Sequence, residues 1–255
     1  MYLTLGDKGK AQTELRKVYG KSGFSLVSDY ADLWDLNHKN SLESVFEIQY
    51  RGGSGNPCSN YWPGFTPYDN LGAVSTRGDG DNQVTDDLWN EYEPDDTRRD
   101  LSIFNGFYQK NGDFMPTKFA KKWVDTEAPV QGERELADNN FIVLRYADVL
   151  LMLSEATGDA KYLNEVRQRA GLPLYGVAGY PSDLYPTLDL AIEHERRVEL
   201  ALEFHRFFDL KRTGRVAEVL KNSEKAITKP QLLLPIPLDV ITQNPDIITQ
   251  NPEYQ

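Results

Sequence analysis

The sequence contains one cysteine, Cys58, and three histidines among 255 residues. A single cysteine excludes a disulfide within the chain, and so few cysteines and histidines argue against a zinc site. No apolar run approaches the roughly 18 residues that a transmembrane helix requires. The first residues also lack the basic, apolar and cleavage segments of a secretory signal.

Positive charge is in deficit as well. The chain has 28 Lys and Arg residues against 39 Asp and Glu residues, which gives a net charge of −11. Nucleic acids and anionic lipid surfaces attract basic proteins, so this balance argues against both as partners. With 40% hydrophobic and 26% charged residues, the composition is that of a globular protein large enough to bury a sizeable core.

The usual catalytic motifs are missing from the sequence. The string that begins at His194 has Val198 where a zinc protease would have its second histidine. No nucleophile elbow or phosphate-binding loop is present. The acidic stretch from Asp79 to Asp87 could gather oxygens for Ca²⁺, but it lacks the ligand spacing of an EF-hand. A glycosidase site with two catalytic carboxylates is still an alternative, because it is defined by the distance between the two groups in space, which the sequence does not show.

The most informative stretch is ERRVELALEFHRFFDLKR, residues 195–212. Its apolar residues recur at helical spacing: Val198, Ala201, Leu202 and Phe208. This pattern predicts one helix from near Thr187 to Gly214 with a single buried stripe. Glu195 and His205 fall on that stripe, and most other positions are charged.

Ionisable groups on a buried stripe need partners, because an unpaired buried charge is very costly. We expect the partners on a second helix over about 141–157, which carries Arg145 and Asp148. The predicted structural ion-pair network consists of Arg145, Asp148, Glu195, Glu199, Arg206 and Asp209.

The stretch ERRVELALEFHRFFDLKRTG closely resembles the C-terminal signature of the SusD/RagB family of outer-membrane nutrient-binding lipoproteins. Residues 141–156, 162–173 and 232–254 resemble the family in the same order. The earlier stretches SGFSLVSDYADLWD and ESVFEIQY are also similar to it. The resemblance covers nearly the whole chain.

This resemblance implies a mainly α fold, a tetratricopeptide-like helical frame that carries a loop-rich lobe with a few short strands. Family members are about twice as long and begin with a lipoprotein signal, so we expect the chain to be a C-terminal part. Residues 1–22 would end the helical-repeat region, 23–138 would form the lobe, and 139–255 would form the C-terminal helices and an extended tail.

The function that the resemblance implies is binding of an oligosaccharide at the cell surface, without catalysis or a cofactor. The glycan would pass into a SusC-like TonB-dependent transporter, and a lipid on an N-terminal part absent from this chain would anchor the protein to the outer membrane. A peptide-binding member of the same family, a glycoside hydrolase and a helical scaffold without a ligand site are the alternatives.

The predicted ligand site is the loop from Arg51 to Thr85, which is rich in Gly, Pro, Asn and Ser and holds four aromatic residues. Long irregular loops in compact proteins commonly carry function. Aromatic rings can stack on sugar faces, while amides and charges can bind hydroxyls; the same rings could instead anchor the loop. The predicted contacts are Asn60, Tyr61, Trp62, Tyr68, Asp69, Asn70 and Arg77, with Trp62 as an exposed stacking platform.

Overall fold

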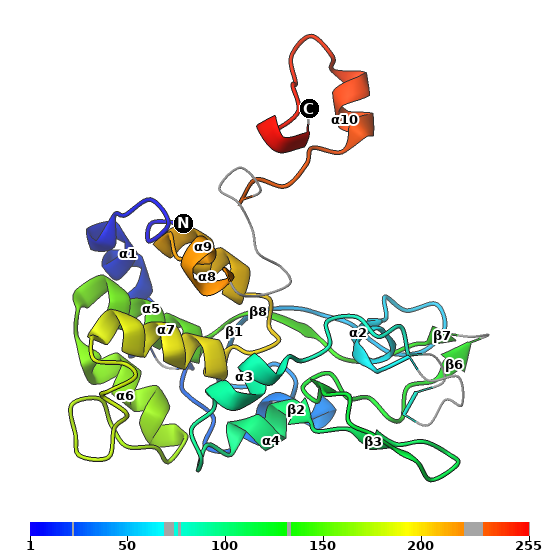
Figure 1. Ribbon diagram of the computed structural model, residues 1–255, viewed down its shortest axis with the longest axis horizontal. Coiled ribbons are helices and arrows are strands. Elements are labelled where there is room, and N and C mark those ends of the chain that lie inside the picture. Colours follow the sequence, from blue (N-terminus) through cyan, green and yellow to red (C-terminus); the bar gives the residue numbers. More distant parts are fainter. Residues whose placement is uncertain (22, 69–73, 76–77, 132–133, 222–231, 255) are drawn as a thin grey trace. The chain divides into compact units, whose positions relative to one another are not determined.

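A computed structural model describes residues 1–21, 23–68, 74–75, 78–131, 134–221 and 232–254 (Figure 1). These residues form two compact units, Met1–Phe204 and His205–Gln255. We describe each unit separately, as the first unit and the second unit.

Helices dominate the first unit, as the sequence predicts. Its helices are α1 (Lys8–Leu15), η1 (Tyr30–Leu33), η2 (Leu36–His38), α2 (Tyr61–Phe65), α3 (Asp86–Glu91), α4 (Arg98–Ser102), α5 (Tyr146–Thr157), α6 (Ala160–Arg169) and α7 (Leu188–Glu199). Local signals explain several of the boundaries. The hydroxyl of Thr85 accepts a hydrogen bond from the amide of Leu88 and so caps α3, and Gly158 ends α5 in the left-handed conformation.

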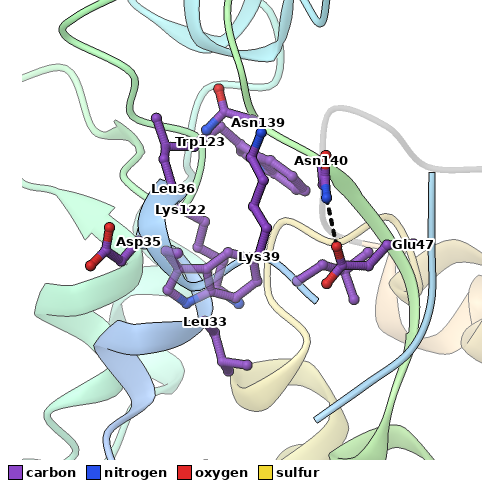
Figure 2. A pocket seen from close by; sticks show the side chains of 11 residues that line it. Leu33, Asp35, Leu36, Lys39, Glu47, Lys122, Trp123, Asn139 and Asn140 are labelled. Atoms are coloured by element: carbon purple, nitrogen blue, oxygen red, sulfur yellow. Dashed lines mark hydrogen bonds between the residues drawn. The ribbon is translucent and has the colours of Figure 1, made fainter. Parts of the chain in front are cut away.

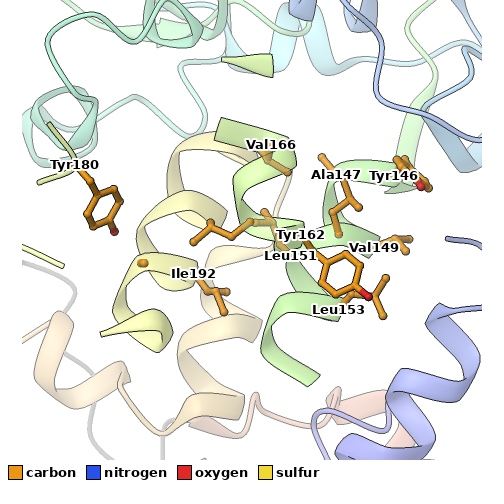
Figure 3. Close-up of a cluster of buried hydrophobic side chains, with 12 residues drawn as sticks. Tyr146, Ala147, Val149, Leu151, Leu153, Tyr162, Val166, Tyr180 and Ile192 are labelled. Carbon is orange, nitrogen blue, oxygen red and sulfur yellow. The ribbon is translucent and has the colours of Figure 1, made fainter. Parts of the chain in front are cut away.

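Helix α5 is the centre of the helical layer, and α1, α6 and α7 pack against it. Most sides of α5 are apolar, which fits a helix whose neighbours bury most of its surface. Figure 3 shows the resulting core, whose buried residues are Tyr146, Ala147, Val149, Leu150, Leu151, Leu153, Tyr162, Leu163, Val166, Tyr180, Ala191 and Ile192.

The strands of the described first unit form short antiparallel pairs, joined by irregular segments. The pairs are β1 (Ser44–Ile48) with β8 (Phe141–Arg145), β2 (Ile103–Phe104) with β5 (Phe119–Ala120), β3 (Phe107–Tyr108) with β4 (Phe114–Met115), and β6 (Val130–Gln131) with β7 (Arg134–Glu135). The expected helix over 141–157 was wrong at its start, because residues 141–145 are drawn into strand β8 by pairing with β1. Strand β1 lies within the stretch ESVFEIQY.

The predicted single helix from Thr187 to Gly214 is also wrong. Helix α7 ends at Glu199, and a turn follows in which Leu202 and Phe204 adopt φ values of 66° and 68°. Side chains replace the next helical turn as hydrogen-bond partners: the carbonyl of Val198 accepts from Tyr92, and that of Glu199 accepts from Tyr30 and Arg145. Left-handed backbone is costly for residues other than glycine, so the tertiary contacts of this turn outweigh that cost.

The second unit contains α8 (Arg206–Thr213), α9 (Val216–Val219), α10 (Leu238–Gln243) and η4 (Pro252–Tyr254). The tail was expected to be extended throughout, but residues 238–243 form helix α10 directly after Pro237. Proline is compatible with the position before a helix because its missing amide hydrogen is not needed there. None of the helices in the described ranges has the length and apolar character needed to cross a membrane.

Candidate functional site

Trp62 lies inside the first unit and is not the exposed platform that the sequence predicted. Its side chain is 3% exposed and packs with Phe107, Phe119 and Ala137. The short helix α2 turns the ring inward, so the loop uses its largest side chain as an anchor. The expectation of an outward-facing Trp62 was therefore wrong.

The other predicted ligand residues are spread over different environments. Tyr61 is half-buried among rings, 5.0 Å from Trp123 and 5.6 Å from Phe141 between centroids, and burial raises its pKa to about 12. Asn60 and Tyr68 are exposed. Asp69, Asn70 and Arg77 lie outside the described residues.

An exposed pair of aromatic rings lies instead on the β3–β4 hairpin, which the sequence reading did not single out. Tyr108 is 71% exposed and Phe114 is 50% exposed, and they are directly opposite each other with ring centroids 5.1 Å apart. Their strand neighbours Phe107 and Met115 pack on the cluster around Trp62. The hairpin thus buries one face and presents two rings to solvent on the other.

Gly106 leaves room for the ring of Phe114 to lie against the backbone. Its φ is +123°, and a Cβ added there would lie 2.4 Å from the Phe114 ring and 2.6 Å from the carbonyl oxygen of Met115. Only glycine allows so close an approach. The sequence signal was available, because an Asn111–Gly112 pair separates two short aromatic stretches, which is typical of a hairpin.

A pocket with about 320 Å³ of unfilled space, counting the part open to solvent, lies on the first unit (Figure 2). Its lining residues come from η1, η2, β1, the segment after β5, and β8 with the residues before it: Leu33, Trp34, Asp35, Leu36, Lys39, Glu47, Lys122, Trp123, Asn139, Asn140 and Ile142. The amide nitrogen of Asn140 donates to Glu47 at 2.7 Å, as the dashed line in Figure 2 shows. The Lys39 ammonium is 2.6 Å from the carboxylate of Asp138 and donates to the carbonyl of Tyr50 at 3.2 Å.

Two tryptophans give this pocket an aromatic wall. The rings of Trp34 and Trp123 meet at 65° with centroids 5.8 Å apart, and the Lys122 ammonium lies 4.6 Å from the Trp34 ring. Burial lowers the pKa of Lys122 although Glu203, at 2.7 Å, opposes the shift. Asp35, which also lines the pocket, has its pKa lowered by a hydrogen bond from the backbone amide of Asn37.

Buried ion pairs connect α7 to the elements around it. We call this set the buried charge network; it consists of Glu43, Asp96, Arg98, Lys122, Arg145, Arg167, Arg169, Glu195, Glu199 and Glu203. Burial alone would raise the pKa of Glu199, but the guanidinium groups of Arg169, Arg145 and Arg98 hold it well below its usual range. The network therefore consists of ionised groups that compensate one another.

The structure brings some of the predicted ion-pair residues together and separates others. Glu195 pairs with Arg98 at 2.6 Å, Arg145 pairs with Glu199, and Asp148 pairs with Arg196 at 2.6 Å. Arg206 and Asp209 belong to the second unit, where Asp209 lies 3.0 Å from Arg212. Their predicted place in a network with Arg145 followed from extending α7 too far.

Several members of the network were missed from the sequence: Glu43, Arg98, Lys122, Arg167 and Arg169. They come from distant parts of the chain. The spacing of residues within one helix carries no information about them, so only the tertiary fold brings them together.

His194 lies beside the network between two carboxylates. Its Nδ1 is 2.8 Å from Glu91 and its Nε2 is 3.4 Å from Glu93, while the ring of Tyr185 stacks on it at 3.9 Å. Burial works against the charged imidazolium, but hydrogen bonds to Glu91 and Glu93 outweigh burial and raise the pKa of His194. In the parts of the chain described by the structure, no group of three His, Cys, Asp or Glu residues could hold a metal ion.

Comparison with known proteins identifies the family. The profile of the SusD family matches residues 104–254, and the chain belongs to this family. SusD-like protein P2 of Formosa agariphila is 28% identical over 252 residues, which cover 83% of this chain and 48% of that protein. The chain thus spans about half the length of that relative.

Solved structures agree with this assignment. A laminarin-binding SusD-like protein superposes with a TM-score of 0.81 at 28% identity, covering 99% of this chain and 60% of that one. Surface glycan-binding protein A from Bacteroides thetaiotaomicron gives a TM-score of 0.79 at 25% identity, covering 98% of this chain and 61% of that one. The mainly α, SusD-like fold predicted from the sequence is confirmed.

Proposed function

We propose that this protein binds a glycan at the cell surface and delivers it to a SusC-like TonB-dependent transporter of the outer membrane, without breaking or forming bonds. Membership of the SusD family supports this proposal. The similarity to a laminarin-binding protein over 99% of this chain makes laminarin the first ligand to examine.

The observation that carries the proposal is the exposed Tyr108–Phe114 ring pair. Exposed aromatic side chains are unfavourable in water, and the ring pair, with Phe114 packed against Gly106, can stack on a flat sugar face. Two rings form a patch much smaller than the roughly 800 Å² per partner of a stable protein interface, so a sugar suits it better than a folded protein.

The hydrolase alternative receives less support from the geometry. A general acid in a glycosidase needs a raised pKa, but Asp35, one of the two carboxylates that line the pocket, has a lowered one. The contacts predicted at Asn60 and Tyr68, like the lipid anchor and the transporter partner, stay predictions.

Calorimetric titration against laminarin and a panel of other oligosaccharides tests the proposal. Phe114→Ala should weaken binding of the preferred glycan by about 10-fold or more, because stacking aromatics are frequent binding hot spots. Phe46→Ala is the matched control, since Phe46 is 55% exposed on strand β1, which pairs with β8 and not with the hairpin strands. Equal affinity of the Phe114 and Phe46 variants would show that the Tyr108–Phe114 ring pair is not part of the binding site.

Failure of the unsubstituted protein to bind any glycan, together with binding of peptides, would favour the peptide-binding alternative. Cleavage of the glycan during titration, detected as new reducing ends, would favour the hydrolase. Co-purification with a TonB-dependent barrel from the outer-membrane fraction would test the transporter partner.

A further inference from the structure

Two of the residues that line the pocket each carry a buried polar atom without a hydrogen-bond partner among the described residues. They are the indole nitrogen Nε1 of Trp34, a donor, and the amide oxygen Oδ1 of Asn139, an acceptor. Asn139 is 3% exposed, and its amide nitrogen donates to the carbonyl of Val124 at 3.3 Å. Buried polar atoms nearly always have a partner, since leaving one unpaired is costly.

The charged groups that line the pocket already have partners, and Asp35 lies 3.0 Å from His38. Lys39 pairs with Asp138 and Lys122 pairs with Glu203. One carboxylate oxygen of Glu47 accepts hydrogen bonds from the side chain of Asn140 and the backbone amide of Asn40. A charged ligand would therefore have to displace an existing ion pair, whereas a neutral ligand would not.

A hydroxyl group fits this arrangement because it both accepts and donates a hydrogen bond. One hydroxyl can accept from Trp34, and a neighbouring one can donate to Asn139 or Glu47. The space inside the pocket that a water-sized group can occupy is about 30 Å³, which is enough for about two hydroxyl groups. This space suits one edge of a sugar ring and not a length of polymer.

We propose that the pocket is a subsite for the hydroxyl-bearing edge of one sugar ring of the bound glycan, with Trp34 Nε1 as hydrogen-bond donor. The inference rests on the proposed function and extends it, because it assigns a second contact that is separate from the β3–β4 hairpin. It predicts selectivity for the hydroxyls of one residue, which stacking on Tyr108 and Phe114 cannot supply.

The test is Trp34→Phe, which keeps an aromatic ring against Trp123 and removes the N–H donor. The protein is labelled with ¹⁵N-tryptophan, and the glycan selected by the titration panel is added. The indole signal of Trp34, identified by its loss in the variant, should shift on binding. Affinity of Trp34→Phe should fall about three- to tenfold, as for one neutral hydrogen bond. Trp89→Phe is the control, because Trp89 lies on α3 against Arg99, outside the pocket lining.

Thermal denaturation of Trp34→Phe shows whether the variant keeps its fold, and the indole shift in the unsubstituted protein does not depend on the variant's stability. If the glycan binds while the Trp34 indole signal stays fixed, the pocket holds water only and the inference is overturned, although the proposed function stands. If no glycan binds the unsubstituted protein, the proposed function and this inference both fall.

Discussion

Replacing Arg145 with methionine would remove a buried guanidinium that binds three carboxylates. Its Nη1 is 2.7 Å from Glu43 and also bonds to Glu199, and its Nε is 2.8 Å from Glu203. Removing one partner of a buried pair costs about 3–5 kcal/mol, since the remaining charge is left uncompensated. For a chain of this size, each kcal/mol lowers the melting temperature by about 2–4 °C, so Arg145→Met should melt roughly 6–20 °C below the parent protein.

The assay is thermal unfolding followed by circular dichroism, with urea titration for the free energy of unfolding. Lys17→Met is the control, because Lys17 pairs with Glu14 at 2.6 Å on the exposed surface. Exposed ion pairs contribute little to stability, so the control should melt close to the parent. A midpoint of Arg145→Met equal to that of the control would refute the network as a stabilising feature.

The pH dependence of the loss separates charge from packing. Burial would raise the pKa of Glu203, but Arg145 and Lys122 together lower it. A lowered carboxyl pKa contributes stability that is present above the unfolded value of 4.5 and is lost as the pH falls through the folded value. The deficit of Arg145→Met should therefore be largest near neutral pH and shrink below pH 4.5. A deficit of constant size would show that the loss comes from packing alone.

Three further predictions concern other parts of the first unit. The raised pKa of His194 adds stability that is present below its ordinary value of 6.5 and is lost as the pH rises through the folded value, so His194→Gln should flatten urea-derived stability between pH 6 and pH 9. Gly106→Ala should destabilise the protein more than Gly112→Ala in urea, because both have positive φ but only Gly106 lies against Phe114. Trp62→Ala should lower the free energy of unfolding by about 3–5 kcal/mol in the same assay, since it leaves a cavity at a buried site. A small loss would indicate that the Trp62 ring is exposed and not buried.

Periodicity and motif order predicted the helical frame because those signals are local. The apolar residues of α5 and α6 and the caps at Thr85 and Gly158 can be read over a few residues of sequence. The charge density around Glu195 and Glu199 also indicated buried ion pairs before any partner was known.

The outcome at Trp62 could not be read from its neighbours. The composition of the loop shows that it contains aromatic rings. Whether a ring faces inward depends on the residues that pack against it, which for Trp62 include Phe107 and Phe119. The exposure of the Tyr108–Phe114 pair could not be predicted for the same reason, since one face of the hairpin is exposed only because the other face is buried.

The sequence by itself determined the family, the mainly α class and the need for a charged interior. Only the tertiary structure decided where α7 stops, because side chains from distant segments, Tyr30 and Tyr92 among them, bind its last carbonyls. It also decided which cations meet Glu199: Arg98, Arg145 and Arg169 lie far apart in the chain and converge on one carboxylate. Such convergence depends on the path of the backbone through space, and the spacing of residues along one helix does not encode it.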